Sequence, residues 1–228
     1  MKIIFLIFTS LSFLFSIEIY DVTNETAKIK VSNLNVGHSG VIIKNVNNNS
    51  LITTQAVVIE STNENSTLEF IQKDILPQDA IPTTNIKPSN GDQFILNHLY
   101  KTSLLIVPNK AAKNELLKIY SNHNFLNEDF FAAHLKIINT PSPTKDDISN
   151  FAQAQQIGTI FVVIKKKLYI LDSITFKIID TVSLKYNDNS TNIPFMTKIK
   201  DIKSSMWSFG DQKITNYNEY YSKLLEIK

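Results

Sequence analysis

Residues 159–184 read TIFVVIKKKLYILDSITFKIIDTVSL, and this stretch indicates three short strands joined by two tight bends. The runs Thr159 to Ile164, Leu168 to Leu171 and Thr175 to Leu184 are rich in β-branched and aromatic residues, which is typical of strands. Lysines occupy the first bend and Asp172-Ser173 the second, so the connections are short. The pattern predicts an antiparallel meander.

Helical signals lie on both sides of this meander, and an apolar strand is predicted at Leu104 to Val107. Four apolar segments are each preceded by a residue that favours the capping position before a helix: Asn109, Asn127, Thr144 and Asn216. Thr144 and Asp147 together approximate a capping box. Gly158 is expected to end the third helix. The last helix has its apolar stripe at i, i+3, i+4, i+7 and i+8: Tyr217, Tyr220, Tyr221, Leu224 and Leu225. The remaining stripes are expected to include Ala112, Leu116, Ile119 and Tyr120, then Phe131, Leu135 and Ile138, and then Ile148, Phe151 and Ala152.

The first half of the chain instead has short segments with a period of two residues, separated by Gly- and Asn-rich turns. The strand candidates are Ala27 to Val31, Val41 to Ile43, Leu51 to Ile59, Leu68 to Ile71 and Phe94 to Leu96. This half is predicted to form a small β-barrel or sandwich. The fold class is therefore α+β, with a β-rich subdomain at 17–97 and an α/β subdomain with a carboxy-terminal helix at 98–228.

The amino terminus has the pattern of a signal peptide, covering residues 1–16. Lys2 is followed by an apolar run from Ile3 to Phe15, and Ser16 supplies a small residue at the expected cleavage position. Thirteen residues form a helix of about 20 Å, which is shorter than the hydrocarbon core of about 30 Å. We therefore expect an exported protein with a cleaved leader, and an uncleaved membrane anchor is the alternative.

Composition excludes several classes of protein. The net charge is only +2, and all 23 basic residues are Lys, so clustered guanidinium groups for nucleic-acid recognition are absent. The chain has no cysteine, and consequently no disulfide and no lipid-modified cysteine. Lys, Asn and Ile are abundant together, as AT-rich codons produce, so a local lysine cluster carries less information than usual.

No residue pattern points to catalysis or to a metal ion, and we expect a non-enzymatic protein without cofactors or a small-molecule substrate. The four histidines, His38, His98, His123 and His134, lack helical metal-site spacing, although convergence of His123 and His134 in space stays open. Gly37-His38-Ser39-Gly40 precedes a strand and is not a nucleophile elbow. Asp146-Asp147 is expected at a helix start. Lys165 to Lys167 is expected at a solvated hairpin tip, with contact to an anion or a partner as the alternative. Trp207 is expected in the core beneath the last helix, with an aromatic binding platform as the alternative.

Several longer stretches, in their order and spacing, support a family resemblance. These are GHSGVII (37–43), NGDQFILNHLYKTSLLIVPN (90–109), FFAAHL (130–135), TPSPTKDDISNF (140–151), IGTIFVVIKKKLYILDSITFKI (157–178) and WSFGDQKITNYNEYYSKLL (207–225). Together they resemble the amino-terminal domain of the plasminogen-binding protein A family of epsilon-class proteobacteria. The resemblance covers nearly the whole chain after the leader.

This resemblance implies an exported protein in the periplasm or on the outer surface of a Gram-negative bacterium, and host plasminogen as the partner. The lysine site of a kringle is an aromatic trough with carboxylates at one end and cations at the other, which suits Lys228 at the end of the sequence. Better-known members have a long charged carboxy-terminal extension that this sequence lacks. The alternative is a periplasmic structural module that contacts other proteins of an envelope or motility complex.

Overall fold

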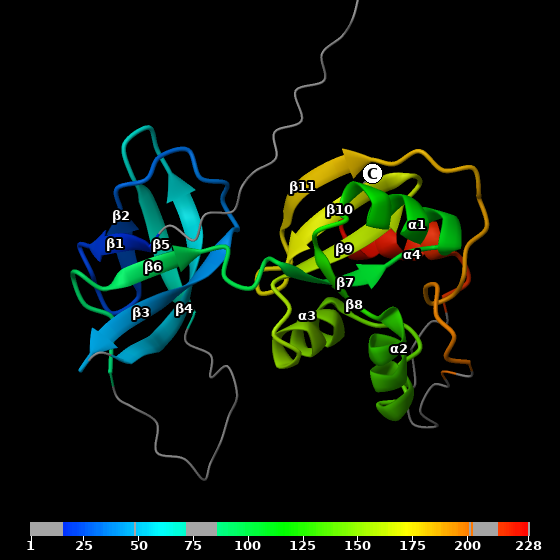
Figure 1. Ribbon diagram of the computed structural model, residues 1–228, viewed down its shortest axis with the longest axis horizontal. Helices are drawn as coiled ribbons and strands as arrows, with labels where there is room; N and C mark the ends of the chain where they lie inside the picture. Colours follow the sequence, from blue (N-terminus) through cyan, green and yellow to red (C-terminus); the bar gives the residue numbers. More distant parts are fainter. Residues whose placement is uncertain (1–15, 48, 72–85, 201, 203–213, 228) are drawn as a thin grey trace, which may run out of the picture.

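The chain forms two β structures in succession, a closed barrel and a mixed sheet flanked by helices. The computed structural model describes residues 16–47, 49–71, 86–200, 202 and 214–227. Figure 1 shows the barrel on the left and the mixed sheet with its helices on the right. The predicted α+β class is confirmed, with a barrel in the first half.

The barrel consists of antiparallel strands whose inward-facing positions are apolar. Its strands are β1 (Ser16–Tyr20), β2 (Thr26–Ile29), β3 (Ser39–Val46), β4 (Asn49–Ser61), β5 (Ser66–Ile71) and β6 (Gln93–Leu96), in the spatial order β1-β2-β5-β4-β3-β6. The barrel closes where β6 pairs with β1. Its interior contains Ile19, Ala27, Ile29, Ile42, Ala56, Val58, Leu68, Phe70 and Phe94. Five of these strands agree with the predicted segments; β1 was not foreseen, because it begins directly after the apolar run interpreted as a leader.

The second sheet combines parallel and antiparallel pairing. It contains β7 (Thr102–Ile106), β8 (Asn124–Leu126), β9 (Thr159–Ile164), β10 (Lys167–Asp172) and β11 (Ile178–Ser183), in the order β11-β10-β9-β7-β8. Strands β9, β10 and β11 form the predicted meander, although a turn delays the start of β11 to Ile178. Strand β7 is parallel to both β8 and β9, and the short strand β8 was not predicted.

Helices cover both faces of this sheet. They are α1 (Lys110–Ile119), α2 (Glu128–Ile137), α3 (Lys145–Ala154) and α4 (Tyr217–Leu224). Apolar residues of α2, α3 and α4 share one cluster with Leu104, Ile106 and Ile160, whereas α1 packs on the opposite side, against Leu105 and Phe161. This half is therefore a three-layer α/β/α structure.

The four predicted helix caps are confirmed. The side chains of Asn109, Asn127, Thr144 and Asn216 each accept a hydrogen bond from a backbone N–H group in the first turn, and Thr144 with Asp147 completes a capping box. Two predicted stripe residues are wrong: Ile119 is 48% exposed and Ile138 is 39% exposed. They lie at the last position of α1 and at the carboxy-terminal cap of α2, where each helix ends.

The sequence predicted that Gly158 ends helix α3, and this prediction is wrong, because α3 ends at Ala154. Gln156 takes the left-handed conformation after α3, with φ of 54°, and the N–H of Ile157 donates to the carbonyl of Ala152. A Cβ atom on Gly158 would lie 2.4 Å from the carbonyl carbon of Leu99 and 2.6 Å from the nitrogen of Tyr100. The glycine therefore allows the start of β9 to pass directly beside the segment that leaves the barrel.

We expect Gly158→Ala to lower the free energy of unfolding by about 3 kcal/mol, since the methyl group would collide with backbone that cannot rotate away. The matched control is Gly91→Ala, because a Cβ there meets only the Glu18 Oε1 atom at 3.9 Å, so that its cost comes from φ of 90° alone. That cost is about 1 kcal/mol. Urea denaturation of both variants tests the difference, and equal losses would refute the steric explanation.

Candidate functional site

The two halves of the molecule meet at the carboxylate of Asp172, which is completely buried at the end of β10. From the barrel side, the Ser39 N–H donates to Asp172 Oδ2 at 3.2 Å, and the Ser39 hydroxyl donates to the same oxygen. The Tyr100 hydroxyl also donates to Oδ2, at 2.5 Å. Burial, and next the charge of Asp172, raise the pKa of Tyr100, which keeps this hydroxyl a donor.

The other carboxylate oxygen organises the bend that follows β10. The N–H groups of Ile174 and Thr175 donate to Asp172 Oδ1 at 2.9 and 2.7 Å. The single hydrogen of the Thr175 hydroxyl is shared between this oxygen, 3.0 Å away, and the carbonyl oxygen of Gly37, 2.9 Å away. One side chain thus shapes the turn within the sheet and binds it to the barrel.

The Gly37-His38-Ser39-Gly40 segment belongs to this junction and has no catalytic geometry. The Ser39 side chain is buried and donates to Asp172, while His38 Nδ1 lies 2.9 Å from Asn97 Oδ1. A Cβ on Gly40 would lie 2.3 Å from the carbonyl oxygen of Ile95. The glycines therefore permit close strand packing, in agreement with a structural interpretation of the motif.

A serine–histidine pair that the sequence did not reveal lies in the second sheet. Ser103 Oγ is 2.7 Å from His123 Nε2 and 2.5 Å from Thr159 Oγ1. Ser103 is 0% exposed, so a substrate cannot reach its hydroxyl. The parallel pairing of β7 with β8 creates this contact, which is why chain spacing alone did not indicate it.

His123 and His134 do not converge. His123 contacts Tyr120, Phe125 and Phe161 on the α1 side of the sheet, whereas His134 lies against Phe151 on the other side. Within the residues that the structure describes, no group of three or more His, Cys, Asp or Glu side chains is arranged to hold a metal ion.

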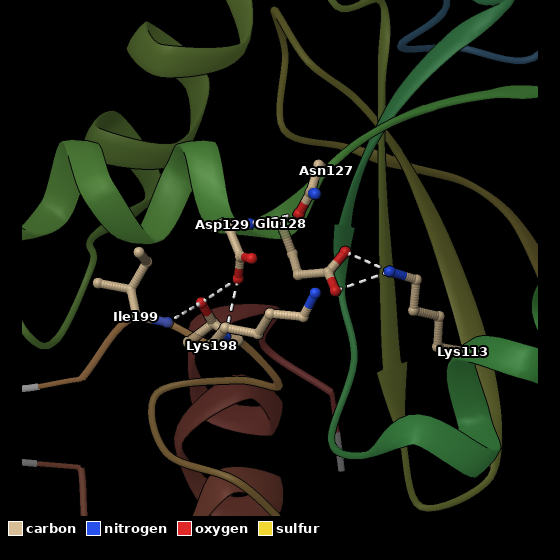
Figure 2. A network of polar contacts seen from close by, with 7 residues as sticks. Lys113, Asn127, Glu128, Asp129, Lys198 and Ile199 are labelled. Carbon is tan, nitrogen blue, oxygen red and sulfur yellow. Dashed lines mark hydrogen bonds and ion pairs between the residues drawn. The ribbon is translucent and has the colours of Figure 1, made fainter.

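The start of α2 carries a polar network that joins three segments, shown in Figure 2. Lys113 of α1 donates to both carboxylate oxygens of buried Glu128, at 2.7 Å each. On the other side, Asp129 Oδ1 accepts from the Thr197 hydroxyl at 2.6 Å and from the Lys198 N–H at 2.8 Å. Both oxygens of Glu128 and the Oδ1 atom of Asp129 accept from the protein itself, so the network anchors the loop after β11 to the start of α2.

Helix α4 is fastened to the sheet by two completely buried tyrosines. The Tyr217 hydroxyl lies 3.0 Å from the carbonyl oxygens of Ile106 and Val163, and so bridges β7 and β9. Tyr221 packs against Tyr217 with ring centroids 4.7 Å apart. Burial raises the pKa of both phenols far above the usual value. Because Leu225 is also buried, the chain is fixed until just before Lys228, which lies outside the described residues.

Three consecutive lysines, Lys165 to Lys167, lie at the turn between β9 and β10. Lys165 and Lys166 form the two-residue connection, and the pair Ile164–Lys167 closes it. The turn is at the carboxyl end of β9, beside Pro108, which follows the parallel strand β7. A hollow of about 310 Å³ lies here, lined by Pro108, Lys165, Lys166, Tyr186, Asp188, Asn189, Ser190, Thr191 and Asn218.

Comparison with known proteins decides the family. The family model described as "Plasminogen-binding protein pgbA N-terminal" matches residues 15–225. The chain belongs to this family. The plasminogen-binding proteins PgbA of Helicobacter pylori strains J99 and 26695 are each 22% identical to it over 214 residues. These matches cover 92% of this chain and 47% of each relative, so the chain spans about half the length of the curated relatives it matches. No solved structure matches it.

Several predicted features of this PgbA-family chain lie outside the described residues: the leader up to Phe15, Trp207 and Lys228. Within the residues that are described, no helix combines the length and the apolar character that a membrane crossing requires. Asp146 and Asp147 lie in the first turn of α3, and Asp147 forms its capping box. The lysine turn at 165–167 lies within the described residues; the sequence predicted a solvated hairpin there and left partner contact as the alternative.

We expect Asp172→Asn to lower the free energy of unfolding by about 3 kcal/mol, because the new amide would direct hydrogens at groups that are themselves donors. Asp146→Asn is the matched control, since Asp146 is exposed at the start of α3, and it should change stability by less than about 0.5 kcal/mol. Urea denaturation of the two variants provides the measurement. Equal stabilities would show that the junction does not depend on the charge.

Acid should destabilise the protein partly through His123, whose pKa is lowered by burial. Because the folded state favours the neutral ring, its contribution is complete above the ordinary pKa of 6.5 and is lost as the pH falls below it. The unfolding free energy should therefore decrease between pH 7.5 and 5.5, and less steeply in His123→Gln. An identical pH slope in this variant would contradict the assignment. His98, whose pKa burial also lowers, should contribute to the slope that remains.

Proposed function

We propose that this protein binds plasminogen, and that it does so by offering lysine side chains to the lysine sites of kringle domains. Membership of the PgbA family over residues 15–225 is the observation that carries this proposal. Two curated relatives bear the name plasminogen-binding protein, at 22% identity. The matched region extends across the barrel and the α/β half, so both belong to the shared unit.

The architecture suits a protein that is recognised rather than one that transforms a substrate. The serine nearest to a histidine is buried, and the carboxylates of Asp172 and Glu128 are saturated by internal donors. By contrast, Lys165, Lys166 and Lys167 are all exposed. A kringle that binds lysine needs an accessible ammonium group, and a rigid support for that group lowers the entropy lost on binding.

Lys228 is the first candidate for this role in our proposal. It follows α4, whose buried tyrosines hold the preceding chain on the sheet, and Lys145 of α3 forms an ion pair with Glu226. Export fits the same function, since plasminogen is an extracellular protein of the host. We accordingly place the protein in the cell envelope, delivered there by the apolar segment from Ile3 to Phe15.

A structural role within the periplasm is the second candidate, and exposed apolar residues on α2 favour it. Phe130 is 61% exposed and Ile137 is 78% exposed, and these residues are seven positions apart on one side of the helix. Such a stripe suits contact with another envelope protein. Cell fractionation with co-purification separates the two roles, because detection at the cell surface without stable envelope partners would reject the structural one.

Immobilised plasminogen should retain the purified protein without its leader, and a lysine analogue such as 6-aminohexanoic acid should release it by occupying the kringle trough. Surface plasmon resonance with and without the analogue provides the measurement. Deletion of Lys228 should weaken binding several-fold if this residue is an anchor, because its ammonium group would be lost. Binding that ignores both the analogue and the deletion would refute recognition of lysine through this residue, and the absence of any binding would refute the proposed function.

A further inference from the structure

The turn between β9 and β10 uses lysine where the backbone favours other residues. Lys165 has φ of 48° and Lys166 has φ of 63°, so both occupy the left-handed region. Two-residue hairpins with this geometry strongly prefer Asn-Gly, since the left-handed conformation costs other residues roughly 1–2 kcal/mol each. The lysine pair is thus retained against a local conformational preference.

Composition does not explain this choice. Lys and Asn are both abundant in the chain, and both are encoded by AT-rich codons, so the same bias would supply Asn at these positions equally well. Asparagine occupies left-handed positions elsewhere, at Asn33, Asn47, Asn97 and Asn139, and so do Asp21, Leu99, Gln156, Phe176 and Glu226. Among the described residues, however, Lys165 and Lys166 are the only consecutive non-glycine pair in this region, so the conformational cost is concentrated at this turn.

The turn is held rigidly from both sides. The N–H of Lys165 donates to Asn218 Oδ1 of α4 at 3.1 Å, and the N–H of Leu184 donates to the carbonyl of Lys166 at 2.8 Å. Strands β9 and β10 pair through six consecutive residue pairs up to the turn. The backbone that carries the lysines is therefore ordered before any partner arrives, which lowers the entropic cost of binding.

The three ammonium groups are not equivalent. Lys166 Nζ lies over the ring of Tyr186, 5.7 Å from its centroid, and Lys167 Nζ lies over Tyr169 at 5.2 Å. In the part of the chain that the structure describes, the Lys165 side chain has no hydrogen bond, ion pair or ring contact. Lys165 is consequently the lysine of the turn whose ammonium group is available to a partner.

A carboxylate accompanies this ammonium group in the same hollow. Asp188 lines the hollow together with Lys165, and its Oδ1 atom accepts from the Ser190 N–H at 2.8 Å. Hydrogen bonds from Ser190 lower the pKa of Asp188, so the carboxylate is charged at neutral pH. Asn109 donates to the carbonyls of Asp188 and Ser190 at 3.3 and 2.7 Å, which fixes this loop beside the turn.

We propose that Lys165 and Asp188 together imitate a carboxy-terminal lysine and form an internal docking site for a kringle. The ammonium group of Lys165 enters the trough and meets its carboxylates, while Asp188 supplies the negative charge that the cationic end of the trough requires. This site rests on the proposed plasminogen function and adds to it a surface that does not involve Lys228. It also gives the Lys165 side chain a role in a turn where asparagine would be more stable.

Lys165→Asn is the decisive variant, because asparagine keeps or improves the turn while removing the ammonium group. We expect it to weaken plasminogen binding at least about tenfold without lowering the melting temperature. Asp188→Asn should weaken binding by several-fold, and Lys165→Arg should not restore full affinity, since a planar guanidinium group does not match an ammonium site. Lys28→Gln is the matched control, because Lys28 of the barrel is already paired with Asp21 at 3.3 Å.

The outcomes separate this site from the proposed function. Loss of binding in the Lys165 and Asp188 variants, with normal binding by Lys28→Gln, supports the internal site. Full binding by Lys165→Asn, with loss on deletion of Lys228, overturns the internal site and leaves the function intact. An equal loss in Lys28→Gln overturns it as well, since general surface charge would then be the cause. If the unaltered protein does not bind plasminogen, both proposals fail together.

Discussion

The buried carboxylate of Asp172 is the interaction on which the arrangement of this molecule depends. A carboxylate removed from water is costly unless its oxygens are satisfied by hydrogen bonds, and here every partner is a donor. The donors come from the barrel, from the segment after it and from the bend of the meander. The charge is therefore tolerated only when all three are in place, which couples folding of the barrel to folding of the sheet.

Small residues make this coupling geometrically possible. Gly40 lets β3 approach β6, and Gly158 lets β9 begin against the backbone of Leu99. With side chains at either position, Ser39 and Tyr100 would be displaced from Asp172. The hydrogen bonds to Asp172 therefore depend on the glycines at positions 40 and 158, which let the donor groups come close enough.

The same framework positions the surfaces that a partner would meet. Tyr217 joins α4 to the carbonyl groups of β7 and β9, and Asn218 of the same helix holds the amide of Lys165. The lysine turn and the chain leading to Lys228 are thus attached to one another through α4. The carboxylates of Asp172 and Glu128 are satisfied inside this scaffold, whereas the lysines at 165–167 remain exposed at its edge, as a surface for recognition requires.

Local signals in the sequence determined the helix caps, the meander and most strands of the barrel, because each depends on residues that are neighbours along the chain. Asn109, Thr144 and Asn216 cap their helices with hydrogen bonds that span only three residues. The parallel pairing of β7, the contact of Ser103 with His123 and the left-handed pair of lysines beside Asp188 were decided by tertiary structure alone. Asp172 illustrates the difference. The sequence predicted that this residue lies in a bend. Its partner Ser39 is 133 positions away, however, and contacts it only after two separate β structures have formed.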